Sequence, residues 1–202
     1  MDFSFSAELQ QRMIPPILAG TQKMCFAVTE PNTGLDTTKL KPRAEKCDGG
    51  YKVTGEKIWI TNAYVADKIM LLVRTTPLDQ VKRKTEGLSL FFTDLDRSKI
   101  EHRLIPKMGR HAVGSTKLFI EDLFVPEEDR IGVEGDGFKI ILHGLNPERV
   151  LLAAEAVGLG RVAIKRAASY AKERIVFDRP IGTNQGVHHP SPNAGQSLRR
   201  QT

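Results

Sequence analysis

The sequence predicts an α+β protein in which a small antiparallel β-barrel is flanked by a short amino-terminal helix and a long carboxyl-terminal helix. Two changes of residue pattern support this fold class. Residues 23–125 contain short runs rich in β-branched and aromatic residues, each bounded by Gly, Asn, Asp or Pro, which is typical of strands. From Gly137 onward, apolar residues recur every three or four positions, which is the period of a helix. The 202 residues suffice for one or two domains.

The first expected element, within residues 7–18, is the last turn of a helix that ends before a pair of prolines. Helix-forming residues continue to Met13, and Pro15 and Pro16 follow. Proline has no N–H to donate and clashes with the preceding turn, so this pair is expected to stop the helix.

The barrel is expected to contain about six strands and no helix. Asp48-Gly49-Gly50 and Gly87 are typical of the turns that link antiparallel strands. The expected strands are 23–30, 51–60, 67–75, 88–95, 100–106 and 116–125.

The long helix is expected to run from Gly137 to about Arg174. Pro147 interrupts the apolar pattern and leaves two alternatives. Either Asn146 caps a new helix with Pro147 at its first position, or one helix continues through a kink. We favour the single kinked helix.

Composition excludes several classes of protein. Hydrophobic residues make up 40% and charged residues 27%, and no apolar run approaches the roughly 20 residues that cross a bilayer. The first residues lack the basic flank and apolar stretch of a signal peptide, so we expect no secretion and no membrane span. Cys25 and Cys47 form no CxxC pair and have no histidine at metal-ligand spacing, so reduced thiols and no metal are expected.

The net charge of +6 is compatible with a phosphorylated ligand or with a nucleic acid. The one dense basic cluster is Lys82-Arg83-Lys84, which has no interleaved aromatic residues and is followed by Glu86. A solvated loop is the better interpretation, and no nucleic-acid partner is expected.

Two strand ends are candidates for binding an aromatic cofactor. Residues 29–36 form a polar turn after one expected strand, and residues 59–62 place Trp59 beside Thr61 at the end of another. An indole offers a stacking face, while hydroxyls and backbone amides can bond heteroatoms. The alternative for Trp59 is an ordinary core tryptophan. No GxSxG, HExxH or P-loop motif is present, and the glycines of residues 132–137 miss the GxGxxG spacing.

Residues 191–202 have no apolar period and no aromatic residue. A disordered tail is one interpretation. The other is a frame shift, because codons can be chosen for this segment that, read one base out of step, spell Leu-Ala-Gln-Cys-Trp-Ala-Lys-Leu-Glu-Ala-Ala-Asp, a helical continuation.

Several long motifs, in the same order and at the same spacing, resemble the acyl-CoA dehydrogenase family. They are KMCFAVTEPNTGLDTT, KIWITNA, FVPEEDRIG, GDGFKIILHGLNPERVLLAAEAVGLG and YAKERIVFDRPIGTNQ. The resemblance implies a β-barrel between two helical domains, with FAD between the barrel and the carboxyl-terminal helices. It therefore predicts a truncated member: a remnant of the amino-terminal helical domain (1–22), the middle barrel (23–126), the start of the carboxyl-terminal helical domain (127–190) and a tail (191–202).

The resemblance also implies roles for individual residues. Trp59 would cover one face of the flavin ring, Thr61 would bond near its N5 atom, and Arg174 would meet the pyrophosphate of the FAD in a neighbouring subunit. The implied cofactor-binding residues are Phe26, Val28, Thr29, Trp59, Ile60, Thr61, Arg174, Phe177 and Gln185. The implied substrate-binding residues are Leu35, Asn146 and Arg149.

Four positions depart from the family pattern. Many members have serine at Leu35, aspartate at Asn146 and glycine at Asp178, and some have threonine at Val176. The changes at Leu35 and Asn146 affect the polar contacts to CoA. The changes at Asp178 and Val176 affect the cofactor contact between subunits.

The reaction implied is α,β-dehydrogenation of an acyl-CoA, with electrons passing to an electron-transfer flavoprotein and with a tetramer or dimer as the assembly. Glu148 matches the catalytic base of one branch of the family, which includes isovaleryl-type enzymes, whereas most members carry the base beyond Pro190. As a second-position residue after a helix cap, Glu148 would instead complement the helix dipole. The alternative function is a non-catalytic barrel fragment that only binds flavin or acyl-CoA weakly or associates with full-length subunits. The compartment stays open between mitochondrion, peroxisome and cytoplasm.

Overall fold

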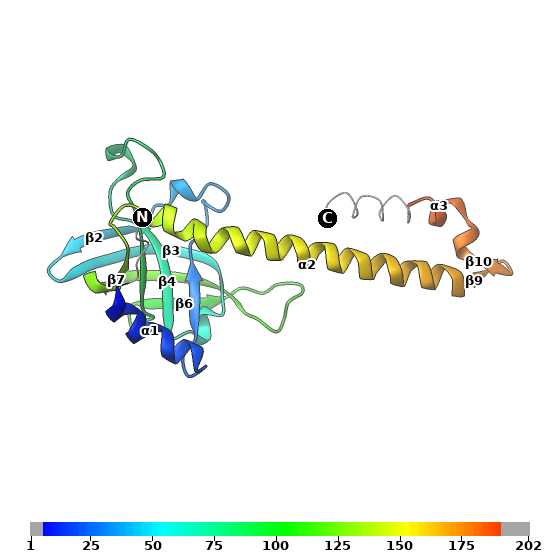
Figure 1. Cartoon of the computed structure of the whole chain (residues 1–202), viewed down its shortest axis with the longest axis horizontal. Coiled ribbons are helices and arrows are strands. Elements are labelled where there is room, and N and C mark those ends of the chain that lie inside the picture. Colours follow the sequence, from blue (N-terminus) through cyan, green and yellow to red (C-terminus); the bar gives the residue numbers. More distant parts are fainter. Residues whose placement is uncertain (1–5, 191–202) are drawn as a thin grey trace. The chain divides into compact units, whose positions relative to one another are not determined.

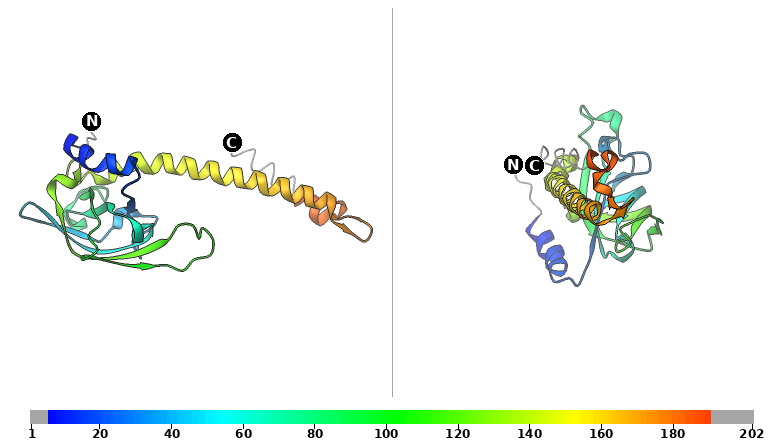
Figure 2. Two further views of the ribbon diagram at one scale, coloured as in Figure 1. Left: turned by 90° about the horizontal axis from the view of Figure 1, so that it is seen from below. Right: turned by 90° about the vertical axis from the view of Figure 1, so that its right-hand side faces the viewer.

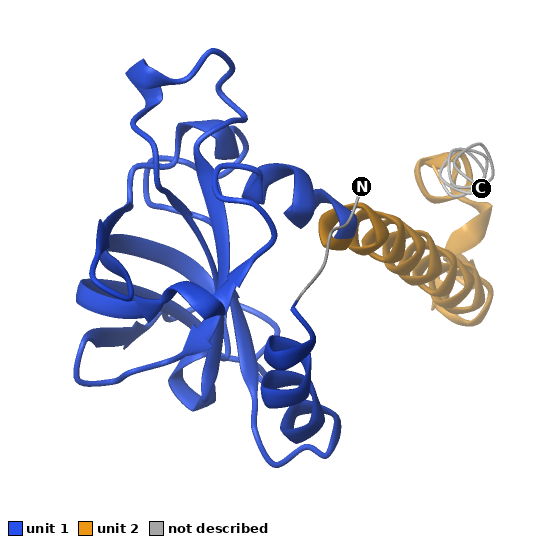
Figure 3. Cartoon of the chain, turned by 60° about the vertical axis from the view of Figure 1, so that its left-hand side comes forward, with its two compact units in different colours: residues 1–143 blue, residues 144–202 orange. Residues whose placement is uncertain are grey.

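The computed structural model describes residues 6–190, which divide into two compact units. The first unit ends at His143 and the second begins at Gly144 (Figure 3). Each unit is described by itself. The frame-shift hypothesis for residues 191–202 lies outside the described residues.

The first unit is built around one curved sheet of eight strands (Figure 1). Their order is β6-β7-β3-β2-β4-β5-β8, and β1 pairs with β4. The strands are β1 (Met24–Ala27), β2 (Arg43–Cys47), β3 (Gly50–Thr61), β4 (Lys68–Arg74), β5 (Leu88–Asp94), β6 (Ile100–Leu104), β7 (Ser115–Pro126) and β8 (Arg130–Ile131).

All six expected strands are present, and the mixed α+β fold class is confirmed. Two strands of the first unit escaped prediction. Strand β2 has the sequence RAEKC, in which only Ala44 is buried, so it carries no apolar alternation. Strand β8 has two residues, too few for any periodicity to register. Between residues 23 and 125 the only helices are short 3-10 turns, η1 (Thr37–Lys39), η2 (Ala63–Val65) and η3 (Leu78–Gln80).

One edge of β4 is shared by two strands that both run parallel to it, so the sheet is mixed rather than wholly antiparallel. Strand β1 pairs along residues 68–71, and β2 meets the same edge at Arg74. Between them the chain leaves the sheet over residues 28–42 and then returns. This excursion contains the polar turn of residues 29–36.

The core lies inside the curve of the sheet. It draws apolar side chains from seven strands, β1 to β7, and Tyr51 of β3 meets Phe91 of β5 edge to face at 4.9 Å between ring centroids. The buried residues contributed by the strands are Cys25, Ala27, Ala44, Tyr51, Val53, Ile60, Ile69, Leu71, Val73, Phe91, Ile100, Leu118, Ile120, Leu123 and Val125.

Helix α1 (Ala7–Leu18) runs through Pro15 and Pro16, so the prediction that the prolines stop it at once was wrong. The carbonyls of both prolines still accept hydrogen bonds from later residues, which closes the last turn. Burial of Leu9 and Met13 also compensates for the N–H groups that the prolines lack, and Figure 2 shows α1 lying beside the barrel. Arg12 fixes the helix further through ion pairs to Glu128 and Asp129 of the turn η4 (Glu127–Asp129).

Helix α2 (Gly137–Glu173) begins where the chain touches β5. The hydroxyl of Ser89 accepts a hydrogen bond from the Gly135 amide at 2.9 Å, and a Cβ added to Gly137 would lie 2.6 Å from the Leu90 nitrogen. The helix continues without a break through Pro147, so the expected single helix is confirmed and Asn146 is not a cap.

Gly137→Ala is expected to lower the free energy of unfolding by about 1–3 kcal/mol, because the methyl group would force the helix start away from the β5 backbone. Gly144→Ala, farther along the same helix, is the matched control. Nothing lies within 4 Å of its added Cβ, so the change should stabilise the helix by about 0.5–1 kcal/mol. Urea unfolding of both variants measures the difference, and equal effects would contradict this account of the helix start.

The second unit contains most of α2 and a short hairpin. Strands β9 (Ile175–Val176) and β10 (Arg179–Pro180) are antiparallel and are followed by η5 (Ile181–Thr183) and α3 (Gln185–His188). Large apolar side chains are exposed along α2, namely Val150, Leu151, Leu152, Leu159, Val162 and Tyr170. Among residues 6–190, no helix is long and apolar enough to cross a membrane.

Candidate functional site

The two polar strand ends singled out in the sequence lie next to each other in the first unit. The Ile58 amide donates to the Thr29 carbonyl at 2.9 Å, which joins the end of β1 to β3. Thr61 is the last residue of β3 and is exposed, and Phe26 and Thr29 are half-buried. The structure therefore brings together the expected cofactor-binding residues of the barrel.

Trp59 is presented to solvent by a β-bulge. The ladder between β3 and β7 shifts register between Lys57 and Ile60, and Trp59 has φ +63°. This left-handed conformation is rare for a bulky residue and costs about 1–2 kcal/mol. The indole is 57% exposed, whereas Ile60 beside it is 2% exposed. The alternative that Trp59 is a core residue is wrong, because the bulge turns its side chain outward.

Two of the expected residues can act only through their backbone. Val28 and Ile60 have buried side chains, at 6% and 2% exposure, so only backbone groups of these residues could meet a ligand at the strand ends. Leu35, in contrast, is fully exposed at the tip of the excursion. Beside it, Asp36 accepts a hydrogen bond from the Thr38 amide at 3.3 Å, and the Thr38 hydroxyl is the main cause of a lowered pKa at this carboxyl group.

A buried ion pair lies directly behind these strand ends, and no motif in the sequence predicts it. The Lys57 ammonium is fully buried and donates to the Val28 carbonyl at 2.9 Å, to Glu30 Oε1 at 2.9 Å and to the Leu72 carbonyl at 2.7 Å. Burial lowers the pKa of Lys57 to about 8, and the charge of Glu30 opposes that shift.

The remaining expected residues lie in the second unit. Glu148 is exposed about three turns after the start of α2 at Gly137, so the helix dipole does not explain it, because that effect is confined to the first turn. Asn146 Oδ1 accepts a hydrogen bond from Arg149 Nη1 at 2.8 Å. The two expected substrate-binding residues of the helix are therefore bonded to each other.

The hairpin after α2 presents Phe177 at its tip. Phe177 and Asp178 form a two-residue turn in which both have positive φ, +52° and +59°, as a type I′ turn requires. Phe177 is 90% exposed. Arg174 lies between the helix and the hairpin, with its amide bonded to the Tyr170 carbonyl, and exposed Gln185 opens α3.

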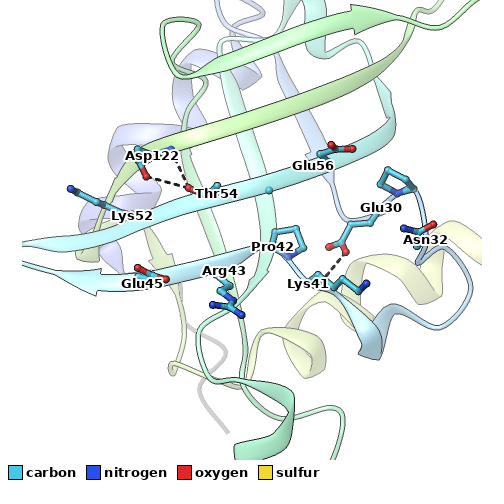
Figure 4. Close-up of a pocket in the computed structure, with 12 residues that line it drawn as sticks. Glu30, Asn32, Lys41, Pro42, Arg43, Glu45, Lys52, Thr54, Glu56 and Asp122 are labelled. Atoms are coloured by element: carbon cyan, nitrogen blue, oxygen red, sulfur yellow. Dashed lines mark hydrogen bonds between the residues drawn. The ribbon is translucent and has the colours of Figure 1, made fainter.

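The hollow drawn in Figure 4 lies beside the excursion, and none of the expected site residues lines it. Its volume is about 600 Å³, and its walls mix positive side chains with Glu45, Glu56 and Asp122. Such mixed charge does not favour a ligand of one sign. Glu30, Pro31 and Asn32 of the polar turn reach this hollow, and Glu30 Oε2 accepts a hydrogen bond from the Lys41 amide at 2.9 Å.

Among residues 6–190, no group of three His, Cys, Asp or Glu residues is placed to hold a metal ion. Both cysteines of the first unit are free thiols.

Alkylation by iodoacetamide at pH 8 is expected to modify Cys47 and to spare Cys25 in the native protein. Cys25 is 3% exposed, and burial raises its pKa to about 12, so almost no thiolate forms. Cys47 is half-buried at the end of β2. Peptide mass spectrometry measures the two sites, and unfolding in urea should abolish the difference. Equal modification of the native protein would contradict the burial of Cys25.

Comparison with known proteins gives consistent matches along the chain. The family profile "Acyl-CoA dehydrogenase, middle domain" matches residues 25–123, and the profile "Acyl-CoA dehydrogenase, C-terminal domain" matches residues 135–193.

Individual relatives and structures agree with these profiles. An acyl-CoA dehydrogenase of Bacillus subtilis is 36% identical over 89% of this chain and 47% of its own length. A mitochondrial isovaleryl-CoA dehydrogenase of Oryza sativa is 31% identical over 87% of this chain and 42% of its own length. Among solved structures, the FAD complex of PigA aligns with a TM-score of 0.86 and 29% identity, covering 96% of this chain and 50% of that one. The chain thus spans about half the length of the relatives it matches.

Proposed function

Because this chain belongs to the acyl-CoA dehydrogenase family, we propose that it supplies the flavin-facing barrel and first carboxyl-terminal helix of an FAD-dependent acyl-CoA dehydrogenase. The observation that carries the proposal is the bulge that exposes Trp59 beside Thr29 and Thr61. A strained backbone and an exposed aromatic side chain both cost free energy, and contact with a ligand would offset that cost.

The chemistry of the strand ends fits FAD. The exposed indole of Trp59 offers a stacking face for the flavin ring, and the Thr61 hydroxyl can donate near its N5 atom. Backbone groups of Phe26, Val28 and Thr29 would supply further hydrogen bonds where β1 ends, apart from the Val28 and Thr29 carbonyls, which already accept from Lys57 and Ile58. Bound FAD would accept the hydride that leaves the β-carbon of the substrate.

Three residues of the second unit extend this proposal. Arg174 would form a charge-assisted hydrogen bond with the pyrophosphate of an FAD held by a neighbouring subunit, with Phe177 and Gln185 beside it. The exposure of Phe177 at the tip of this turn supports the role, because its ring is accessible to a neighbouring subunit. This arrangement requires a homo-oligomer, for which we propose a tetramer or dimer.

We assign the removal of the substrate α-proton to Glu148. Its position about three turns into α2 removes the dipole explanation, and a match to isovaleryl-type relatives supports a base on this helix. To act near neutral pH the carboxylate must become desolvated when the acyl-CoA is bound, because an apolar pocket raises a glutamate pKa toward the working range.

The substrate is proposed to contact Leu35, Asn146 and Arg149, and the electrons to pass to an electron-transfer flavoprotein. The hydrogen bond between Asn146 and Arg149 supports a shared role in orienting the substrate. For the chain as a whole we propose the organisation 1–22, 23–126 and 127–190, with the barrel in the middle.

Anaerobic titration of the FAD-loaded protein with straight-chain and branched-chain acyl-CoA tests the reaction. We expect bleaching of the flavin absorbance, with the matching enoyl-CoA detected by mass spectrometry. Absence of bleaching with every acyl-CoA, at saturating FAD, would contradict the proposed activity.

A further inference from the structure

We propose that the buried pair Lys57–Glu30 is a positioning device that ends the β1–β4 ladder and thereby holds Thr29 and Trp59 in the geometry that a flavin requires. The proposal deepens the proposed function and rests on it for the identity of the ligand. It assigns to these two buried residues a role that the contacts at the site surface do not reveal.

The first argument is where the ammonium group lies. The last parallel pair of the ladder is Ala27 with Leu71. If the ladder continued, Val28 would come next to Leu72. The Lys57 ammonium instead donates to both of those carbonyls, at 2.9 and 2.7 Å. A positive charge thus satisfies the two acceptors at the point where β1 leaves the sheet.

The second argument is what the carboxylate holds. One oxygen of Glu30 accepts from Lys57, and the other accepts from the amide of Lys41 at 2.9 Å (Figure 4). The backbone of Glu30 also exchanges two hydrogen bonds with Thr33. One side chain therefore connects the departing end of the excursion, residues 28–30, with its returning end before β2.

The third argument is that Lys57 is part of the bulge. It is the last residue of regular pairing between β3 and β7 before the register shift, and Trp59 follows two positions later. Between them the Ile58 amide bonds the Thr29 carbonyl. The orientation of the indole and the position of Thr29 are therefore both determined by the segment that the ammonium group anchors.

Stability alone does not account for this pair. Desolvating two charges offsets much of their attraction, and well-packed apolar side chains of similar volume are often equally stable in such positions. Burial depresses the pKa of Lys57, which reflects that cost. A polar pair that contributes little to stability can still specify one geometry among several, which is the role proposed for it here.

The test compares two variants of the pair with one control. Lys57→Met removes the cation and keeps its approximate volume, and Glu30→Gln removes the charge of its partner with a smaller disturbance. Lys68→Met is the control, because Lys68 is also a buried lysine in an ion pair, with Asp94, but at the opposite end of β1.

Two measurements are made on the 202-residue protein. Trp59 is the only tryptophan, so its emission maximum and acrylamide quenching report the bulge without any ligand. The dissociation constant for FAD is then measured by titration. Thermal unfolding of each protein gives a temperature at which all variants are folded. Both measurements are made at that temperature, so that a general loss of stability is not mistaken for a change at the site.

We expect both pair variants to change the emission and quenching of Trp59 and to weaken FAD binding by about tenfold or more, as the loss of an oriented hydrogen bond does. Lys68→Met should leave the Trp59 fluorescence and the FAD dissociation constant unchanged, even if it lowers thermal stability as much as the pair variants do or more. Unchanged Trp59 quenching in folded Glu30→Gln and Lys57→Met would overturn the proposal, and if Lys57→Met does not fold, Glu30→Gln decides alone. If the parent protein binds no FAD, the proposed function fails, while the Trp59 measurement still decides the positioning role.

Discussion

Replacement of Glu148 by glutamine is expected to lower kcat at least about 100-fold, in a chain of the relatives' full length, while FAD binding and the flavin spectrum stay unchanged. Glutamine keeps the size of the side chain but cannot accept the α-proton. Glu148 is exposed on the middle of α2, so its loss should leave the fold intact. Steady-state assay with an artificial electron acceptor measures the change.

Glu155→Gln is the matched control, because Glu155 is an exposed glutamate two turns later on the same helix. Its turnover should equal that of the parent enzyme. Turnover of Glu148→Gln within a few-fold of the parent would move the base to another part of the enzyme. Loss of FAD in this variant would instead indicate a structural role for Glu148.

The second large effect is expected at Trp59. Both Trp59→Ala and Trp59→Gly should weaken FAD binding by about ten- to hundredfold, because stacking on an aromatic side chain contributes about 1–3 kcal/mol. Stability should separate the two variants. At φ +63° glycine avoids the strain that alanine retains, so Trp59→Gly should be more stable than Trp59→Ala by about 1 kcal/mol.

Trp59→Phe is the control for stacking, and it should keep most of the FAD affinity. Isothermal titration and urea unfolding measure the two quantities separately. Equal stability of the glycine and alanine variants would mean that the bulge relaxes when the indole is removed. Unchanged FAD affinity in both would mean that the indole does not face the flavin.

Local sequence pattern was sufficient for the longer strands, which bury apolar side chains on one or both faces. The strands over 51–60 and 88–95 alternate or concentrate apolar residues, and both formed as expected. Strand β2 was missed because its residues are held by neighbours on both sides, β3 and β4, rather than by their own apolar pattern. The prediction that Pro15 and Pro16 end α1 failed for a related reason, since burial of Leu9 and Met13 outweighed a local helix-breaking signal.

The candidate site could be predicted in part. The aromatic and hydroxyl residues at the strand ends were visible in the sequence, because they interrupt apolar strands with groups suited to a ligand. Lys57 and Glu30 were not, since an isolated lysine and an isolated glutamate 27 residues apart look like ordinary surface charges. Only the return of β3 past the end of β1 makes them partners.

The most direct test of the central claim is an NMR titration of the 15N-labelled 202-residue protein with FAD. The single indole N–H of Trp59 gives one resolved signal, and the method detects weak binding. We predict saturable shifts of this signal and of the amides of Val28, Thr29 and Thr61, with the amides of β6 unchanged. Shifts confined to other surfaces, or no saturable shift of the Trp59 indole, would contradict the assignment of the strand ends as the flavin site.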